Sequence, residues 1–310
     1  MTYDQIFAKA QEAFLFYKNL PGKEKAAFLR KIADGLEAEK ATIIPLASKE
    51  SNLPEGRITG ELGRTTGQIR LFAKLVEEGS WVEATIDHAD PNRSPAPKPD
   101  IRRFLTPLGP VVVFGASNFP LAFSVAGGDS ASALAAGCPV VVKAHPSHPN
   151  TCQVVYEAIT KAITAQGLPK EIFTLVQGVN PEITHWLAKA PEVTAIGFTG
   201  SGMVGKLLIK LAQEREVPIP VYAEMGSINP VFILPRILEV NGATLAQNFV
   251  GSVTLGVGQF CTNPGILFHD AQKDDSFKNA LKMEFEKTNG GVMLAASIFQ
   301  SYTKAVEQHD

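Results

Sequence analysis

The strongest constraint on the fold is a regular alternation of apolar, β-branched segments with amphipathic segments in the middle of the chain. The apolar segments, expected as strands, are PVVVFGA, CPVVVKAH, IFTLVQG and VTAIGFTG. The amphipathic segments, expected as helices, are PLAFSVAGGDSASALAAG, NTCQVVYEAITKAITAQG, PEITHWLAKA and SGMVGKLLIKLAQER. Uniformly apolar strands that alternate with helices are typical of a parallel sheet covered on both faces. The sequence therefore predicts an α/β fold.

The flanking segments have other patterns. Residues 1–80 carry apolar side chains at three- and four-residue spacing, which predicts helices. WVEATID and IRRFLTPLG flank a proline-rich loop, which predicts a projecting two-stranded arm near residues 81–108. Because such an arm exposes strand edges, we expect another subunit or domain to cover it. Further on, VPIPVYAEMG and NPVFILP are expected as strands, and ATLAQNFVGSVTLGVGQFC as a helix that ends in a glycine-rich turn.

Charge and composition exclude several classes of function. The net charge is -2, from 29 basic and 31 acidic residues, which gives no positive field for non-specific nucleic-acid binding. Residues 104–128 are uncharged and approach the length of a membrane span, but their prolines and glycines would break a spanning helix. The chain begins without a secretory pattern, and an odd count of three cysteines fits a reducing compartment. Small-molecule chemistry in the cytoplasm is favoured.

Cys261 is a candidate nucleophile because glycines surround it in GVGQFCTNPG and let the backbone bend around the thiol. A cysteine taken alone is more often a small core residue, and we expect that role for Cys138 and Cys152. Glu224 ends an apolar strand, where partial desolvation would raise its pKa toward that of a general base; a surface glutamate is the alternative. Asn118 follows a buried strand at the sheet edge that binds ligands, or is a turn asparagine.

A phosphate-binding turn is a weaker candidate. Gly200 and Gly205 follow a strand at the start of a helix, where backbone N–H groups and the helix dipole can face a pyrophosphate. Lys206 is followed by leucine, so the segment is not an ATP-type P-loop. Lys143 suits a ribose or phosphate contact, although a solvated lysine also explains it. The histidines show no metal-ligand spacing, and no metal is expected.

The motifs GASNFPLAF, CPVVVKAHPSHP, GFTGSGMVG, AEMGSINPVF and GQFCTNPG resemble, in order and approximate spacing, those of the aldehyde dehydrogenase superfamily. The resemblance covers essentially the whole chain. GRTTGQIRLFA and KAHPSHP are most similar to the subgroup of 2,5-dioxovalerate (α-ketoglutaric semialdehyde) dehydrogenases and related NADP-using enzymes. The resemblance implies a Rossmann-type cofactor domain over residues 1–230 and the first part of an α/β catalytic domain over residues 231–310.

The resemblance also implies roles for individual residues. Cys261 would add to an aldehyde to give a thiohemiacetal, and Asn118 with the Cys261 backbone N–H would hold the oxyanion. Glu224 would activate the water that hydrolyses the resulting thioester. Phe119 maps to the wall of the substrate tunnel. The residues that map to cofactor contacts are Lys143, His145, Ser147, Gly200, Ser201, Gly205 and Met225.

Two departures from the family pattern carry expectations. Many members have a glutamate three residues after the lysine, whereas this chain has Pro146, which removes a charge that would repel a ribose phosphate. We therefore expect NADP to be preferred over NAD. Family chains usually continue well beyond the catalytic cysteine, so the chain resembles a C-terminally truncated member. We expect it to be poorly soluble or inactive alone, and the full-length parent to be a homodimer or homotetramer.

Alternatives remain open from the sequence. A catalytically silent, cofactor-binding or scaffolding relative would keep the same fold. A cysteine hydrolase or acyltransferase is disfavoured because no histidine is placed to pair with Cys261. A substrate with its own carboxylate would need a cation near the tunnel, and Arg64 or Arg70 could supply one, although each could equally be a solvated or capping arginine.

Overall fold

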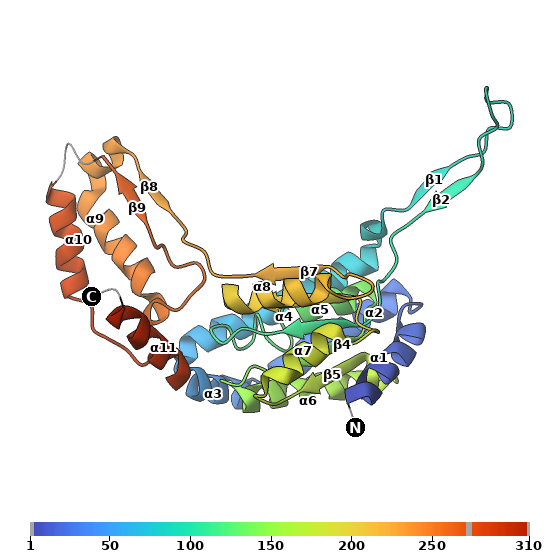
Figure 1. Cartoon of the computed structure of the whole chain (residues 1–310), viewed down its shortest axis with the longest axis horizontal. Helices are drawn as coiled ribbons and strands as arrows, with labels where there is room; N and C mark the ends of the chain where they lie inside the picture. Colours follow the sequence, from blue (N-terminus) through green and yellow to red (C-terminus); the bar gives the residue numbers. More distant parts are fainter. Residues whose placement is uncertain (1–2, 271–274, 309–310) are drawn as a thin grey trace.

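The computed structural model describes residues 3–270 and 275–308, and its centre is a parallel sheet of five strands in the order β5-β4-β3-β6-β7 (Figure 1). The strands are β3 (Val111–Phe114), β4 (Val140–Lys143), β5 (Phe173–Val176), β6 (Ala195–Thr199) and β7 (Val221–Glu224). The strand order reverses between β3 and β6, and open α/β sheets bind ligands at such a reversal, beyond the carboxyl ends of the strands. The predicted parallel sheet is confirmed.

Side chains of the central strands alternate between two cores. Val111 and Val113 of β3 pack into one apolar cluster, whereas Val112 and Phe114 pack into the other. Helices α2 (Gly22–Ala38), α3 (Lys40–Ser51), α4 (Glu55–Glu78), α5 (Gly128–Ala136) and α6 (Pro149–Ala165) contribute to the first cluster. Helices α7 (Pro181–Lys189) and α8 (Gly202–Gln213) contribute to the second, and α1 (Tyr3–Tyr17) contributes to both. Burial on both faces explains why these strands are uniformly apolar.

One predicted helix is wrong in its first half and confirmed in its second. The segment from residue 120 to residue 137 was expected to be helical throughout, but the helix begins only at Gly128. The preceding residues form a tight loop in which the Ala116 N–H donates to the Phe123 carbonyl at 2.7 Å. A Cβ at Gly115 would lie 2.8 Å from Ser124 Cα, so this close approach of two backbone segments requires glycine. Packing of the loop on itself overrides its local helix propensity.

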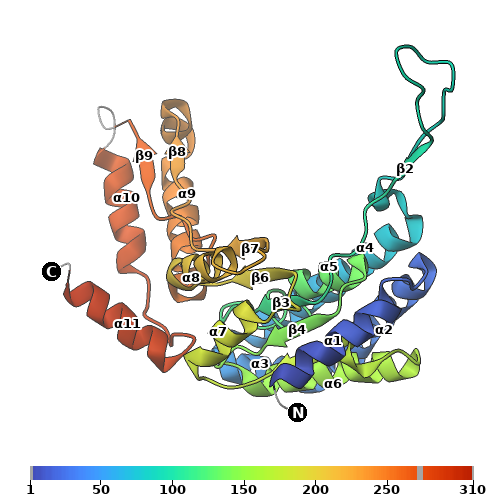
Figure 2. The ribbon, with the colours of Figure 1, turned by 45° about the vertical axis from the view of Figure 1, so that its right-hand side comes forward.

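The predicted arm is confirmed as two short antiparallel strands, β1 (Thr85–Asp87) and β2 (Ile101–Arg103). A turn of 3-10 helix, η1 (Ser80–Val82), replaces the first part of the expected strand. The arm projects from one end of the molecule, and both of its strands are exposed (Figure 2). What covers the arm stays a prediction.

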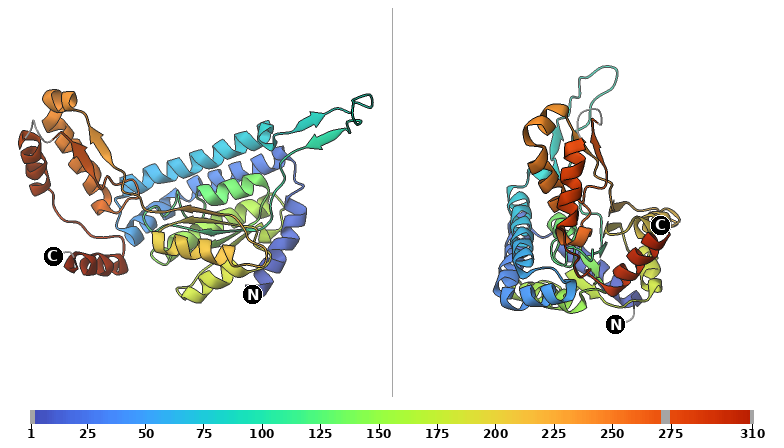
Figure 3. Two further views of the ribbon diagram at one scale, coloured as in Figure 1. Left: turned by 45° about the horizontal axis from the view of Figure 1, so that its top comes forward. Right: turned by 90° about the vertical axis from the view of Figure 1, so that its left-hand side faces the viewer.

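A second small sheet lies at the other end of the molecule from the arm (Figure 3). Its strands, β8 (Val231–Ile233) and β9 (Leu267–His269), are parallel. They pack with α9 (Pro235–Thr254) and α10 (Asp275–Glu286) around a separate apolar cluster that contains Ile233 and Phe277. Helix α9 begins earlier than expected and is interrupted at Asn241.

The remaining elements are the 3-10 turns η2 (Lys170–Ile172) and η3 (Leu255–Gly258), and the helix α11 (Ala296–Glu307). The domain boundary between residues 230 and 231 remains a proposal. Across the described ranges 3–270 and 275–308, no helix has the length and apolar content that crossing a membrane requires.

Candidate active site

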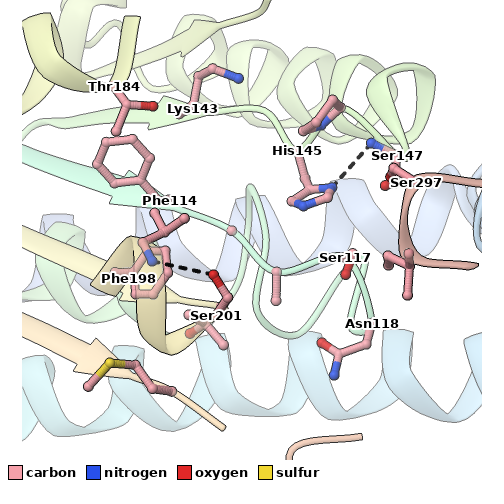
Figure 4. Close-up of a pocket in the computed structure, with 18 of the residues that line it drawn as sticks. Phe114, Ser117, Asn118, Lys143, His145, Ser147, Thr184, Phe198, Ser201 and Ser297 are labelled. Atoms are coloured by element: carbon pink, nitrogen blue, oxygen red, sulfur yellow. Dashed lines mark hydrogen bonds between the residues drawn. The ribbon is translucent and has the colours of Figure 1, made fainter. Parts of the chain in front are cut away.

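A cavity of about 800 Å³ lies at the carboxyl ends of the central strands (Figure 4). The ends of β3, β4, β6 and β7 line it, together with the loop that follows α9. The predicted site residues that line this cavity are Asn118, Lys143, His145, Ser147, Gly200, Ser201, Glu224, Met225 and Cys261. Gly205 and Phe119 do not line it and lie behind its wall. The volume is within the range of ordinary ligand sites, which is about 300–1,000 Å³.

Cys261 sits at the end of a loop of unusual backbone conformation. Gly256, Val257 and Gly258 have φ angles of 58°, 58° and 70°, in the left-handed region. A Cβ at Gly256 would lie 2.6 Å from the Phe260 ring, so glycine is required there. The Asn229 side chain fixes the far side of the loop by donating to the Cys261 carbonyl at 2.7 Å. The thiol residue is only partly buried, unlike an ordinary core cysteine.

Asn118 is held directly beside the cysteine loop. Its Nδ2 donates to the Gln259 carbonyl at 2.9 Å, although the two residues are 141 positions apart. Gln259 is itself held, because its Oε1 accepts the Leu294 N–H at 3.0 Å. A primary amide has two N–H donors, so Asn118 keeps one for a further acceptor in the cavity.

Glu61 is a buried carboxylate that sequence analysis did not single out. Its Oε1 accepts the backbone N–H groups of Leu121 at 2.8 Å and Ala122 at 2.9 Å, and its Oε2 accepts from Arg57 at 2.9 Å. Burial raises the pKa of Glu61, while these hydrogen bonds and the Arg57 charge oppose the rise. Glu61 therefore ties α4 to the loop that carries Asn118. The sequence feature that could have identified Glu61 is its position among Ile58, Leu62 and Thr65 on the buried face of α4.

Glu224 lies at the end of β7, where it is paired in register with Thr199 of β6. The structure leaves Glu224 exposed, so the expected partial desolvation is not present. Asp129, at the start of α5, lies close enough to interact with Glu224. Burial of Asp129 and repulsion by the Glu224 charge both raise the pKa of Asp129. Glu224 thus enters the cavity as an accessible carboxylate.

Lys143 and His145 line the edge of the cavity that follows β4. Lys143 Nζ donates to the carbonyls of Gly178 at 2.6 Å and Ala144 at 2.8 Å, so it is held rather than freely solvated. Burial lowers the pKa of Lys143. Burial, together with the neighbouring His148 and Lys143, lowers the pKa of His145 to about 3, so its ring is neutral at pH 7. His145 Nδ1 accepts the Ser147 N–H at 3.1 Å (Figure 4).

The N-terminus of α8 faces the same cavity. Ser201 caps the helix, since its Oγ accepts the Val204 N–H at 3.4 Å. Gly205 has a packing role: a Cβ there would lie 2.5 Å from Met225 Sδ, so glycine allows α8 to approach the end of β7. Gly200 is tied to the same strand, because its N–H donates to the Glu224 carbonyl at 3.0 Å.

The comparison with known families decides what kind of protein this is. The profile of the aldehyde dehydrogenase family matches residues 1–300. The chain belongs to the aldehyde dehydrogenase family. It is 50% identical over 294 residues to α-ketoglutaric semialdehyde dehydrogenase 2 of Azospirillum brasilense, covering 94% of this chain and 56% of that protein. It is 43% identical over 305 residues to α-ketoglutaric semialdehyde dehydrogenase of Acinetobacter baylyi, covering 98% of this chain and 58% of that protein.

The chain therefore spans a little over half the length of these curated aldehyde dehydrogenases. Solved structures agree on the fold. The NAD+ complex of betaine aldehyde dehydrogenase from Staphylococcus aureus superposes with a TM-score of 0.84 at 20% identity, over 99% of this chain and 60% of that one. The NADP complex of glyceraldehyde-3-phosphate dehydrogenase GapN from Methanocaldococcus jannaschii superposes with a TM-score of 0.76 at 22% identity, over 93% of this chain and 59% of that one.

The other two cysteines of the chain are buried, as predicted. Cys152 Sγ lies 3.3 Å from His148 Nδ1, and His148 Nε2 lies 3.0 Å from the Ala116 carbonyl. Since that carbonyl can only accept, Nε2 carries the proton and the thiol of Cys152 donates to Nδ1. This Cys–His pair is sealed in the core, where Cys152 is 1% exposed and His148 is 0% exposed. Within the described part of the chain, no group of three or more His, Cys, Asp or Glu side chains could hold a metal.

Proposed function

We propose that this chain carries the nucleophile and cofactor site of an aldehyde dehydrogenase that oxidises α-ketoglutaric semialdehyde (2,5-dioxopentanoate) to the dicarboxylic acid with NADP or NAD. The observation that carries the proposal is one cavity lined by Cys261, Asn118 and Glu224 together with the N-terminus of α8. The substrate is proposed from the relatives that share 50% and 43% identity with the chain.

In the proposed reaction, the Cys261 thiolate attacks the aldehyde carbon and a C–S bond forms. The free N–H of Asn118 and the Cys261 backbone N–H stabilise the oxyanion of the thiohemiacetal. The cofactor, when bound, supplies the acceptor for the hydride that leaves the former aldehyde carbon. Glu224 takes a proton from water as that water attacks the thioester, and cleavage of the C–S bond returns the cysteine. The exposure of Glu224 gives water direct access to this carboxylate.

The residues at the cavity edge fit a dinucleotide. The Ser201-capped helix presents backbone N–H groups to a pyrophosphate, and open space around Gly202 allows close approach. Among the described residues that line the cavity, Glu224 is the one carboxylate. Pro146, in place of a glutamate, puts no negative charge beside Lys143. This charge distribution supports a preference for NADP, because a ribose phosphate meets no repulsion on that side.

Thiol labelling tests the proposal without requiring complete turnover. The purified chain is treated with iodoacetamide, and each cysteine is quantified by peptide mass spectrometry. We expect rapid labelling of Cys261, slow labelling of the buried Cys138 and Cys152, and a change in the Cys261 rate alone when NADP is added. NADP should act at lower concentration than NAD. Labelling of all cysteines at similar rates, or no response to either cofactor, contradicts the proposal.

Turnover provides the second measurement. Reduction of NADP by 2,5-dioxopentanoate is followed by absorbance, with Cys261→Ser as the blank, and we expect it to be weak or absent in this chain alone. Cofactor binding without thiol reactivity would instead favour a silent, cofactor-binding relative. The cytoplasmic location and the homo-oligomeric state expected from the sequence stay predictions.

A further inference from the structure

Three aromatic rings form a layer behind the nucleophile and the oxyanion donor. Phe119 directly follows Asn118, and Phe260 directly precedes Cys261. The centroids of Phe119 and Phe260 are 5.1 Å apart, and those of Phe119 and Phe123 are 5.0 Å apart. Phe119 and Phe260 are almost fully buried, with exposed fractions of 8% and 9%. Any group placed on this layer is therefore positioned by the same two loops that hold the reacting atoms.

Two guanidinium groups of α4 lie over this aromatic layer. Arg57 Cζ is 4.8 Å from the Phe119 centroid and 5.1 Å from that of Phe260. Arg64 Cζ is 5.7 Å from the Phe119 centroid and 4.9 Å from that of Phe123. A guanidinium is attracted to the π face of an aromatic ring, and with five N–H donors it can also bind an anion.

The charges around these groups leave one cation uncompensated. Arg57 is paired with the buried Glu61 at 2.9 Å. Arg64 is exposed and makes no ion pair with the described residues. By contrast, Arg70 is paired with both Asp34 and Glu37 on α2, which makes it a structural arginine. The set of Arg57, Glu61 and Arg64 carries a net charge of one, which suits a single carboxylate.

We infer that Arg64, with Arg57 beside it, forms the subsite for the distal carboxylate of the substrate. The substrate class is then an aldehyde with a carboxylate at its far end, and the two arginines determine this specificity. This inference rests on the proposed function, because it needs the aldehyde carbon to be at Cys261. The carboxylate accepts in-plane N–H groups of Arg64, a charge-assisted contact that a neutral aldehyde cannot make.

Paired alkylating reagents test the subsite. Iodobutyrate and iodobutyramide have the same length and differ in the terminal charge. In each reaction the Cys261 thiolate displaces iodide and forms a C–S bond. The ratio of the two rates at Cys261, measured by peptide mass spectrometry, reports how strongly the site favours a carboxylate. Glutarate, a dicarboxylate, is added in a second arm as a protecting ligand against iodobutyramide.

We expect Arg64→Gln to lower the iodobutyrate to iodobutyramide ratio by about tenfold, since a charge-assisted hydrogen bond is lost. Protection by glutarate should weaken by a similar factor. The rate with iodobutyramide alone should not change. Arg70→Gln is the matched control, on the same helix, and should leave the ratio unchanged. Arg64→Lys should keep part of the preference because the charge remains.

An unchanged ratio in Arg64→Gln overturns the subsite, as does an equal fall in Arg70→Gln. These outcomes leave the proposed function intact, because Cys261 still reacts. Failure of Cys261 to react with either reagent contradicts the proposed function itself and removes the basis of the subsite. Circular dichroism of each variant checks that the exposed substitution leaves the fold unchanged.

Discussion

Replacing Glu61 with alanine tests how firmly α4 holds the loop that carries Asn118. Glu61 Oε1 accepts the backbone N–H groups of Leu121 and Ala122, which are themselves buried. A buried donor left without an acceptor costs about 1–3 kcal/mol, so two cost roughly 2–6 kcal/mol. Loss of a carboxylate whose charged form is disfavoured by burial offsets part of this. We expect the free energy of unfolding to fall by roughly 2–4 kcal/mol.

Glu61→Gln is the matched control. The glutamine carbonyl can still accept both backbone N–H groups, and only the contact with Arg57 is lost. That arginine side chain is 27% exposed and can be hydrated instead, so the expected loss is about 1 kcal/mol or less. Equilibrium urea unfolding, followed by circular dichroism, measures both variants. Equal stability of the alanine and glutamine variants would refute the reasoning, because the backbone hydrogen bonds would then contribute nothing.

The stability difference between the wild type and Glu61→Gln should change with pH in a direction that the pKa of Glu61 determines. Because the folded-state pKa of Glu61 is raised above its ordinary value of 4.5, the folded protein binds the proton more tightly than the unfolded chain. This contribution to stability is fully present below pH 4.5 and is lost as the pH rises through the folded-state pKa. The wild type should therefore lose stability relative to Glu61→Gln over that rise. A gain instead would mean that the charged form is favoured by folding.

Three further substitutions probe separate features. Glu50 accepts four hydrogen bonds at the first turn of α6; burial raises its pKa, but these bonds outweigh burial and lower it overall. Glu50→Ala should lower the free energy of unfolding by about 1–2 kcal/mol. The stability advantage of the wild type should be present above pH 4.5 and lost as the pH falls through the lowered pKa of Glu50. Urea unfolding at several pH values measures both effects. Tyr17→Phe removes a buried 2.8 Å hydrogen bond to α5 and should lower the unfolding free energy by about 0.5–1.5 kcal/mol; no change would contradict it. Gly205→Ala should displace Met225 and weaken NADP binding in calorimetry; unchanged affinity would contradict this packing role.

The inner strands β3, β4 and β6 were predictable because both faces of each are buried, so their residues, such as Val112 and Val141, are almost all apolar. The same argument placed Asn118 and Lys143 at one sheet edge, since parallel strands all end on the same side. The first half of the helix expected from residue 120 was wrong because its alanines and leucine describe only local propensity. What decides that loop is Glu61, 60 positions away, and a single glutamate on a helix gives no sign of its partner.

Sequence could not establish the surroundings of the arginines either. Arg64 and Arg70 occupy the same helix at a spacing of six residues, and both are typical of a solvated face. Only the folded chain distinguishes them, because one meets carboxylates of α2 while the other meets the rings of Phe119 and Phe123. The exposure of Glu224 was likewise set by the position of β7 at the edge of the sheet.

The hydrogen bond from Asn118 to the Gln259 carbonyl joins two loops that come from distant parts of the chain. Because of this hydrogen bond, a displacement of the Asn118 amide is coupled to a displacement of the loop that carries the Cys261 sulfur. A ligand that attracts the Asn118 amide therefore also exerts a force on the Gln259 carbonyl, two residues before Cys261. In the proposed reaction, binding of the oxyanion by Asn118 would therefore be coupled to the position of the thiol through this hydrogen bond.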